Sequence, residues 1–162
     1  MARLAHQWAV RLKRLGYDID PELLRTAGLL HDIARLKPDH ARAGARILRM
    51  EGYPVMAGII QCHHRLEGGE ESGLTERTLL FLADKMTLED RMVDIDERFR
   101  QSAPKCTTPQ AGENHRLQYN QAQAVRHCLE SAMGSLEAAD AFGTSPQASV
   151  DRKARIREWA AG

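Results

Sequence analysis

Residues that can bind a divalent metal follow one another through the first half of the sequence. They comprise five imidazoles and two carboxylates: His6, His31, Asp32, His40, His63, His64 and Asp84. Neutral imidazole and carboxylate are ligands that suit borderline divalent metals such as iron, manganese, cobalt, nickel and zinc. These seven side chains are therefore candidates that could converge on one site.

The spacing of these residues places them on the apolar faces of expected helices. His31 lies four residues after Ala27, and His63 lies four residues after Ile59. Residues four apart share one face of a helix, so these polar groups point into a core. A buried polar or charged side chain must be hydrogen-bonded, ion-paired or metal-bound, because an isolated one is too costly. The spacing alone leaves these three possibilities open.

Helical periodicity dominates the chain, and strands have little support. Expected helices cover about 4–15, ended by Gly16; 21–30, capped by Asp20; 40 to near Gly52, capped by Asp39; 54–61; 76 toward Phe99, opened by Thr75 and bending near Leu88; 117–136; and a short amphipathic segment at 150–159. The stretches 65–74 and 102–112 are expected as an exposed loop and a connection. The fold class is all-α. We expect a single domain, with residues 1–100 as the metal-binding core and 101–162 packing on it.

Charge and composition restrict the partners. The 23 Lys and Arg residues nearly balance the 22 Asp and Glu residues, for a formal net charge of +1. This gives no electrostatic reason to expect nucleic acid or a membrane surface as the main partner. The sequence has no apolar run long enough to span a membrane and no signal-peptide pattern, so a cytoplasmic protein is expected. The three cysteines form no paired motif, which argues against a disulfide framework. The sequence leaves a homodimer open.

The ordered residues carry a resemblance to a known family. His6, then Leu29-Leu30-His31-Asp32, His40, His63-His64 and Leu82-Ala83-Asp84-Lys85 together resemble the HD superfamily of metal-dependent phosphohydrolases, over roughly residues 2–100. The additional histidines are similar to the branches that hold two metals, nearest to the bacterial dinucleoside-tetraphosphate hydrolases. Arg35 stands where those branches usually have lysine. The Gly-Tyr-Pro signature of the cyclic-di-GMP enzymes is missing after the paired histidines.

This resemblance implies an HD-domain helical bundle and assigns a role to each candidate. His6, His31, Asp32 and Asp84 would hold one divalent metal, and Asp32 would bridge to a second held by His40, His63 and His64. The metals would activate a water toward phosphorus. Arg35 and Lys85 would then grip the phosphoryl oxygens. Two alternatives stay open. In one, His64 orients another ligand; in the other, Arg35 and Lys85 are solvated or ion-paired.

The function that the resemblance implies is hydrolysis of a phosphomonoester or phosphoanhydride, with a phosphorylated small molecule such as a nucleotide or dinucleotide as substrate. The alternative is a non-catalytic HD module that senses a nucleotide or regulates another domain. The few residues before His6 are compatible with one domain of a longer protein. A complete ligand set favours catalysis over sensing.

Overall fold

A computed structural model describes residues 1–89 and 91–134 of the chain. Its helices are α1 (Ala2–Arg14), α2 (Pro21–Leu30), α3 (His40–Met50), α4 (Pro54–Gln61), α5 (Glu76–Lys85), α6 (Ile95–Ser102) and α7 (Pro109–Met133), with short 3₁₀ turns η1 (Glu70–Ser72) and η2 (Ala103–Lys105). In this described part, the strands are two residues each, β1 (Thr87–Leu88) and β2 (Arg91–Met92), paired antiparallel. The all-α prediction is confirmed.

Local signals in the sequence set several helix ends. Asp20 caps α2, because its carboxylate accepts from the backbone amides of Glu22 and Leu23 at 2.9 and 3.1 Å, and Pro21 occupies the first helical position. Thr75 caps α5 through its hydroxyl, which accepts from the amide of Thr78. These caps fix where the two helices begin.

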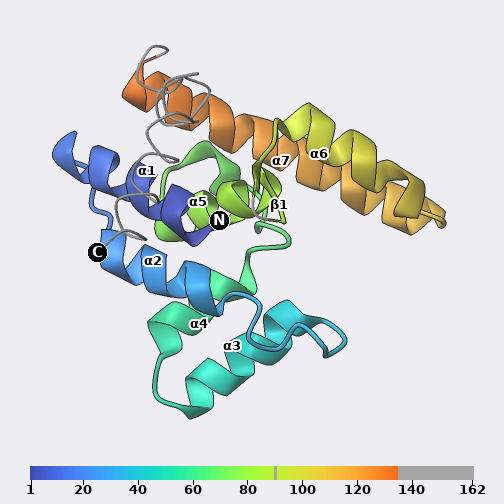
Figure 1. The fold of residues 1–162 in the computed structure, drawn as a ribbon, viewed down its shortest axis with the longest axis horizontal. Coiled ribbons are helices and arrows are strands. Elements are labelled where there is room, and N and C mark those ends of the chain that lie inside the picture. Colours follow the sequence, from blue (N-terminus) through green and yellow to red (C-terminus); the bar gives the residue numbers. More distant parts are fainter. Residues whose placement is uncertain (90, 135–162) are drawn as a thin grey trace, which may run out of the picture.

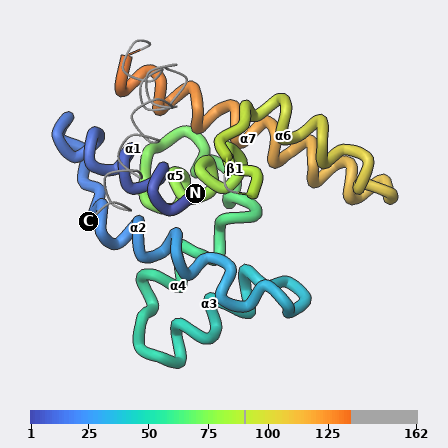
Figure 2. The backbone as a smooth tube through the Cα atoms, viewed as in Figure 1, coloured from blue at the N-terminus to red at the C-terminus, as the bar shows by residue number. Residues whose placement is uncertain are grey.

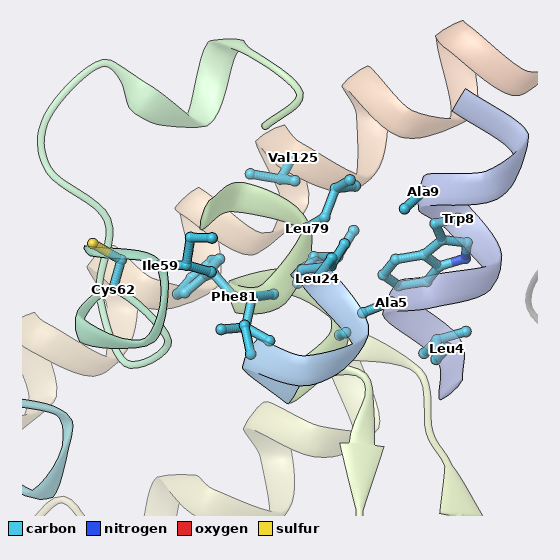
Figure 3. Close-up of a cluster of buried hydrophobic side chains, with 14 of the residues drawn as sticks. Leu4, Ala5, Trp8, Ala9, Leu24, Ile59, Cys62, Leu79, Phe81 and Val125 are labelled. Carbon is cyan, nitrogen blue, oxygen red and sulfur yellow. The ribbon is translucent and has the colours of Figure 1, made fainter. Parts of the chain in front are cut away.

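The core lies where α1, α2, α5 and α7 meet. Trp8 of α1, Leu24 of α2, Phe81 of α5 and Val125 of α7 are fully buried there, and Figure 3 shows their side chains gathered around α5. Every residue from Thr78 to Ala83 is buried, so α5 is surrounded on all sides. Burial of this kind is the main source of stability in such a bundle.

The remaining helices pack at two places around this core: α3 and α4 pair with each other, and α6 pairs with α7. Figure 1 shows α3 and α4 as a hairpin beside α2, while α7 crosses the opposite side of the bundle and continues next to α6. The tube in Figure 2 follows the same path and shows α6 and α7 extending together away from the core. Among the described residues, none of the helices has the length and hydropathy needed to cross a lipid bilayer.

One predicted cap and one predicted helix end differ from the structure in the first hundred residues. Asp39 is the residue before α3, as expected, but it does not cap the helix with its side chain. Its backbone is left-handed, with φ of +46°, and its carboxylate lies 3.5 Å from Nε of Arg42 instead. The helix expected from residue 76 toward Phe99 ends at Lys85 and is followed by the β1–β2 hairpin and α6. The turn places Glu89 at φ of +57°, which interrupts a helix.

The predictions for the later segments also need adjustment. The long helix begins at Pro109, not near 117, because Thr108 caps it by accepting from the amide of Ala111 at 3.1 Å. The 65–74 loop is not fully exposed, since Leu66 is buried and η1 lies within it. The amphipathic segment at 150–159 falls outside the described residues.

Candidate metal centre

His31 and Asp32 stand directly after the last residue of α2. The backbone continues there in tight turns, in which the amide of Arg35 donates to the carbonyl of Asp32 at 2.9 Å. One turn earlier, α1 packs closely on α2 at Gly28, where an added Cβ would lie 2.7 Å from Cα of Ala2. Glycine at this position therefore lets the two helices approach and fixes the end of α2.

The other candidates also occupy helix ends. His40 is the first residue of α3, His63 and His64 follow α4 after Cys62, and Asp84 is in the last turn of α5. Helix termini leave backbone groups unpaired and allow side chains to turn toward a common point. The ends of α2, α3, α4 and α5 thus bring ligands from four segments to one place.

Asp32 lies between the imidazoles. Its Oδ1 is 3.0 Å from Nε2 of His40 and 3.8 Å from Nε2 of His63, while its Oδ2 is 3.5 Å from Nε2 of His31. Asp84 reaches the same His31 nitrogen, with Oδ1 at 3.8 Å. One carboxylate therefore connects two groups of ligands.

The second group is a cluster of three imidazoles. One ligand atom from each of His40, His63 and His64 lies within 4.8 Å of the others. Nε2 of His40 is 2.7 Å from Nε2 of His64 and 3.2 Å from Nε2 of His63. Imidazole nitrogens this close to one another cannot all carry a proton, so some of them present lone pairs to the same point. A divalent cation at that point would bind these lone pairs together.

Backbone contacts set the tautomers of two histidines. Nδ1–H of His31 donates to the carbonyl of Gly28 at 2.9 Å, and Nδ1–H of His63 donates to the carbonyl of Ile60 at 2.6 Å. A carbonyl can only accept, so Nδ1 carries the proton in both rings and, in a neutral ring, Nε2 has a lone pair. Those lone pairs face carboxylate oxygens, an arrangement that a cation stabilises. The donor set fits a divalent metal.

Burial keeps two of the imidazoles neutral. Desolvation lowers the pKa of His63, and it lowers the pKa of His64 to about 4 with help from the neighbouring positive charges of His63 and Lys85. Burial by itself would raise the pKa of Asp84. The charge and hydrogen bond of Lys85, with His63 and His31, outweigh burial and hold that pKa below its ordinary value. Neutral imidazoles and an ionised carboxylate are the protonation states that bind metal.

The two cationic candidates are both ion-paired with a proposed ligand, one of the alternatives that the sequence left open. Lys85 is buried, and its Nζ donates to Oδ2 of Asp84 at 3.0 Å and to the carbonyl of His63 at 3.1 Å. These two contacts hold Asp84 and the backbone of His63 in place. Arg35 is exposed at the edge of the site, and its Nη1 donates to Oδ2 of Asp32 at 2.9 Å.

His6 is not brought to the cluster. Its Nε2 lies 3.1 Å from Oε1 of Glu22 at the beginning of α2, whereas His31 follows the other end of that helix. Ala2, four residues earlier in α1, is the residue that packs at Gly28. At about 1.5 Å per residue, His6 is therefore displaced along α1 from the place where it would meet Asp84.

One residue that the sequence analysis did not single out contacts the segment after the paired histidines. Gln121 of α7 is buried and bonds the backbone of Leu66. In the sequence, Gln121 is marked only by its place beside the apolar stripe of a long helix. That stripe consists of Ala122, Val125 and Leu129.

Comparisons with known proteins agree with this geometry. A family model described as HD domain matches residues 1–96. An uncharacterised protein from Methanocaldococcus jannaschii is 34% identical over 101 residues, which cover 57% of this chain and 57% of that protein. The match thus spans little more than half the length of this relative. No solved structure is significantly similar.

Proposed function

This chain belongs to the HD domain family, the superfamily of metal-dependent phosphohydrolases, and we propose that it hydrolyses a phosphomonoester or phosphoanhydride of a nucleotide or dinucleotide at a dinuclear metal centre. The proposed ligands of one metal are His31, Asp32 and Asp84. Those of the other are Asp32, His40, His63 and His64. His6 is left out because it pairs with Glu22.

The observation that carries the proposal is the position of Asp32. Its two oxygens face different groups of imidazoles, Oδ1 toward His40 and His63 and Oδ2 toward His31. A carboxylate can bridge two cations in this way, and each side of it has further ligands. A site for one metal would not need ligands on both sides.

When bound, two divalent metals supply an activated water and neutralise charge on phosphoryl oxygens. The chain's own residues provide the orientation. His31 and His63 are held by their Nδ1–H bonds to backbone carbonyls, and Asp84 is held by Lys85. Arg35, exposed beside Asp32, is the candidate to contact a substrate phosphate, since a guanidinium binds phosphate oxygens in pairs.

The proposal is tested on the full chain purified without chelator. Metal content is measured by elemental analysis, and phosphate release from a panel of nucleotides and dinucleotides is followed with manganese, iron, cobalt, nickel or zinc added. We expect two metals per chain and turnover of at least one substrate. The alanine variant of Asp32 serves as the inactive control, because both metals would depend on it.

Three results would count against the proposal. One metal per chain at saturation would rule out the dinuclear centre. Nucleotide binding without phosphate release, under every metal, would favour the regulatory module. Equal turnover by the parent and the Asp32→Ala variant would place the activity elsewhere or in a contaminant.

A further inference from the structure

The backbone that carries His64 is held on both sides by buried side chains. On one side, Nζ of Lys85 donates to the carbonyl of His63 at 3.1 Å. On the other, Leu66 is bonded twice by Gln121: its amide donates to Oε1 at 3.3 Å, and its carbonyl accepts from Nε2 at 3.0 Å. His64 and Arg65 lie between these two anchored points.

The contact with Gln121 comes from outside the family region. Gln121 lies on α7, 55 residues after Leu66 and beyond the segment 1–96 that matches the HD domain. Its neighbours on the buried face of α7 are the apolar Ala122, Val125 and Leu129. An apolar residue would pack there at lower cost, because a buried amide is unfavourable unless both its ends are paired. Here both ends are paired with one residue, Leu66.

The segment between α4 and η1, which carries His63 and His64, needs Gln121 as a partner because it has no regular secondary structure. Between α4 and η1 the backbone has no helix or sheet to satisfy its amides and carbonyls, and Leu66 is buried away from water. Backbone groups in such a position are almost always paired. The side chain of Gln121 supplies that pairing and so fixes the direction in which the chain leaves His63 and His64.

We propose that Gln121 is a positioning residue for the metal centre: by clamping Leu66, it holds the backbone of His63 and His64 in register with His40. The inference rests on the proposed function, in which these three imidazoles bind one of two metals. It adds that α7, outside the matched HD region, controls the occupancy of that one metal. Removal of a group that is hydrogen-bonded directly to a metal ligand changes metal affinity by about 10–100-fold. We take the same range for the clamp, which acts on His63 and His64 through the backbone.

The effect should be larger at one metal than at the other. The hydrogen-bond and charge partners described for His31 and Asp84 are Gly28, Asp32, Lys85 and each other, and Gln121 contacts none of them, whereas His63 and His64 lie on the clamped segment. Loss of the clamp should therefore weaken the site of the three imidazoles more than the site of His31 and Asp84. A merely structural role would weaken both equally or neither.

The test compares Gln121→Leu, Gln121→Glu and Gln123→Leu in the full chain. Leucine removes both bonds to Leu66, and glutamate keeps the acceptor for its amide. Gln123 lies on the same helix and bonds Asp96 and Tyr119, so it is the matched control. Cobalt(II) is titrated into chelated protein, with binding followed by calorimetry and by the visible absorption of each cobalt environment.

We expect Gln121→Leu to weaken one of the two cobalt steps by about 10–100-fold, Gln121→Glu to recover part of the loss, and Gln123→Leu to change neither step. Thermal unfolding of the chelated variants separates this effect from lost stability. Equal weakening of both steps, or unchanged steps in folded Gln121→Leu, would overturn the inference.

A second readout needs no metal. Imidazole signals of the chelated protein in NMR spectra should shift for His63 and His64 in Gln121→Leu and stay unchanged for His6, which pairs with Glu22. If the parent binds only one cobalt ion, the dinuclear proposal fails while this readout still tests the clamp. If the signals of His63 and His64 do not move in Gln121→Leu, the clamp is refuted whatever the metal content.

Discussion

The ammonium of Lys85 lies 3.0 Å from the carboxylate of Asp84, its neighbour in α5, and is turned inward. The same ammonium donates to the carbonyl of His63 and lies 5.2 Å from the ring centroid of Phe81. It therefore connects a ligand of one proposed metal to the backbone of a ligand of the other. Its positive charge also keeps Asp84 ionised.

Replacement of Lys85 by methionine is the first prediction. Methionine fills similar volume without the charge, so the pKa of Asp84 should rise, since the charge and hydrogen bond of Lys85 are the main opposition to the effect of burial. Metal affinity should fall by about 10–100-fold, and binding should weaken at a higher pH than in the parent. The measurement is metal titration across pH. Lys37→Met, at an exposed position, is the control; equal affinity in both variants would show that Lys85 has no such role.

Asp32→Ala is predicted to remove both metals and abolish turnover. The two oxygens of Asp32 face ligands of both proposed sites, so its loss should lower metal content more than His40→Ala does. The helical fold should persist in the chelated variant, because Asp32 lies in a turn at the edge of the core. Elemental analysis and circular dichroism check the two statements. Retention of both metals would mean that Asp32 is not the bridge.

The helices could be predicted from sequence because their signals are local. Asp20, Pro21 and Gly16 mark helix ends through contacts with residues a few positions away. The paired histidines and the His-Asp dipeptide could be assigned as ligands because a family pattern orders them. Their convergence at four helix ends then follows from the fold.

At the site, the contacts that the sequence did not specify are those between distant segments. Nothing near Lys85 in the sequence says that its ammonium will meet the carbonyl of His63, 22 residues earlier. The partner of Gln121 lies 55 residues away. His6 was assigned from its order in the chain, whereas the register of α1 on α2, set at Ala2 and Gly28, decides what it meets. Such registers depend on packing, which the spacing of apolar residues does not specify.

His6→Ala should leave the metal content unchanged. Its Nε2 pairs with Glu22 at 3.1 Å, and the described contacts of the centre do not include it. His31→Ala is the matched variant that should lose metal, because Nε2 of His31 faces both Asp32 and Asp84. Elemental analysis of both variants decides the point. If His6→Ala loses as much metal as His31→Ala, α1 must shift along α2 when metal binds.

The stability of metal-free protein should fall as the solution becomes acidic. The pKa of His64 is about 4 in the fold and about 6.5 in an unfolded chain, with burial as the main cause, and that of His63 is also lowered by burial. The unfolded chain therefore takes up these protons first, and stability is lost progressively as pH falls from about 6.5 toward 4. Although neighbouring side chains desolvate its ring, His64 as a whole residue remains accessible to solvent, which screens part of this effect.

Thermal unfolding of chelated protein between pH 7 and pH 4 measures this loss. His64→Gln should flatten the dependence on pH, since glutamine does not titrate in that range. His127→Gln, at an exposed position of α7, should leave it as steep as in the parent. The expectation is wrong if both variants give the parent's slope.

The last prediction separates substrate binding from metal assembly at Arg35. Its side chain is 77% exposed and its Nη1 lies 2.9 Å from Oδ2 of Asp32, so the guanidinium lies at the surface beside the proposed bridge. Arg35→Ala should keep both metals but raise KM, lower kcat, or both, depending on whether its contact with phosphate tightens in the transition state. Arg35→Lys should restore only part of the activity, because an ammonium keeps the charge and loses the paired geometry. Arg42→Ala is the matched control, since Arg42 is 78% exposed and ion-paired with the aspartate three residues before it, as Arg35 is. If metal content falls along with activity in Arg35→Ala, the arginine acts by orienting Asp32; if neither changes, it plays no part in the reaction.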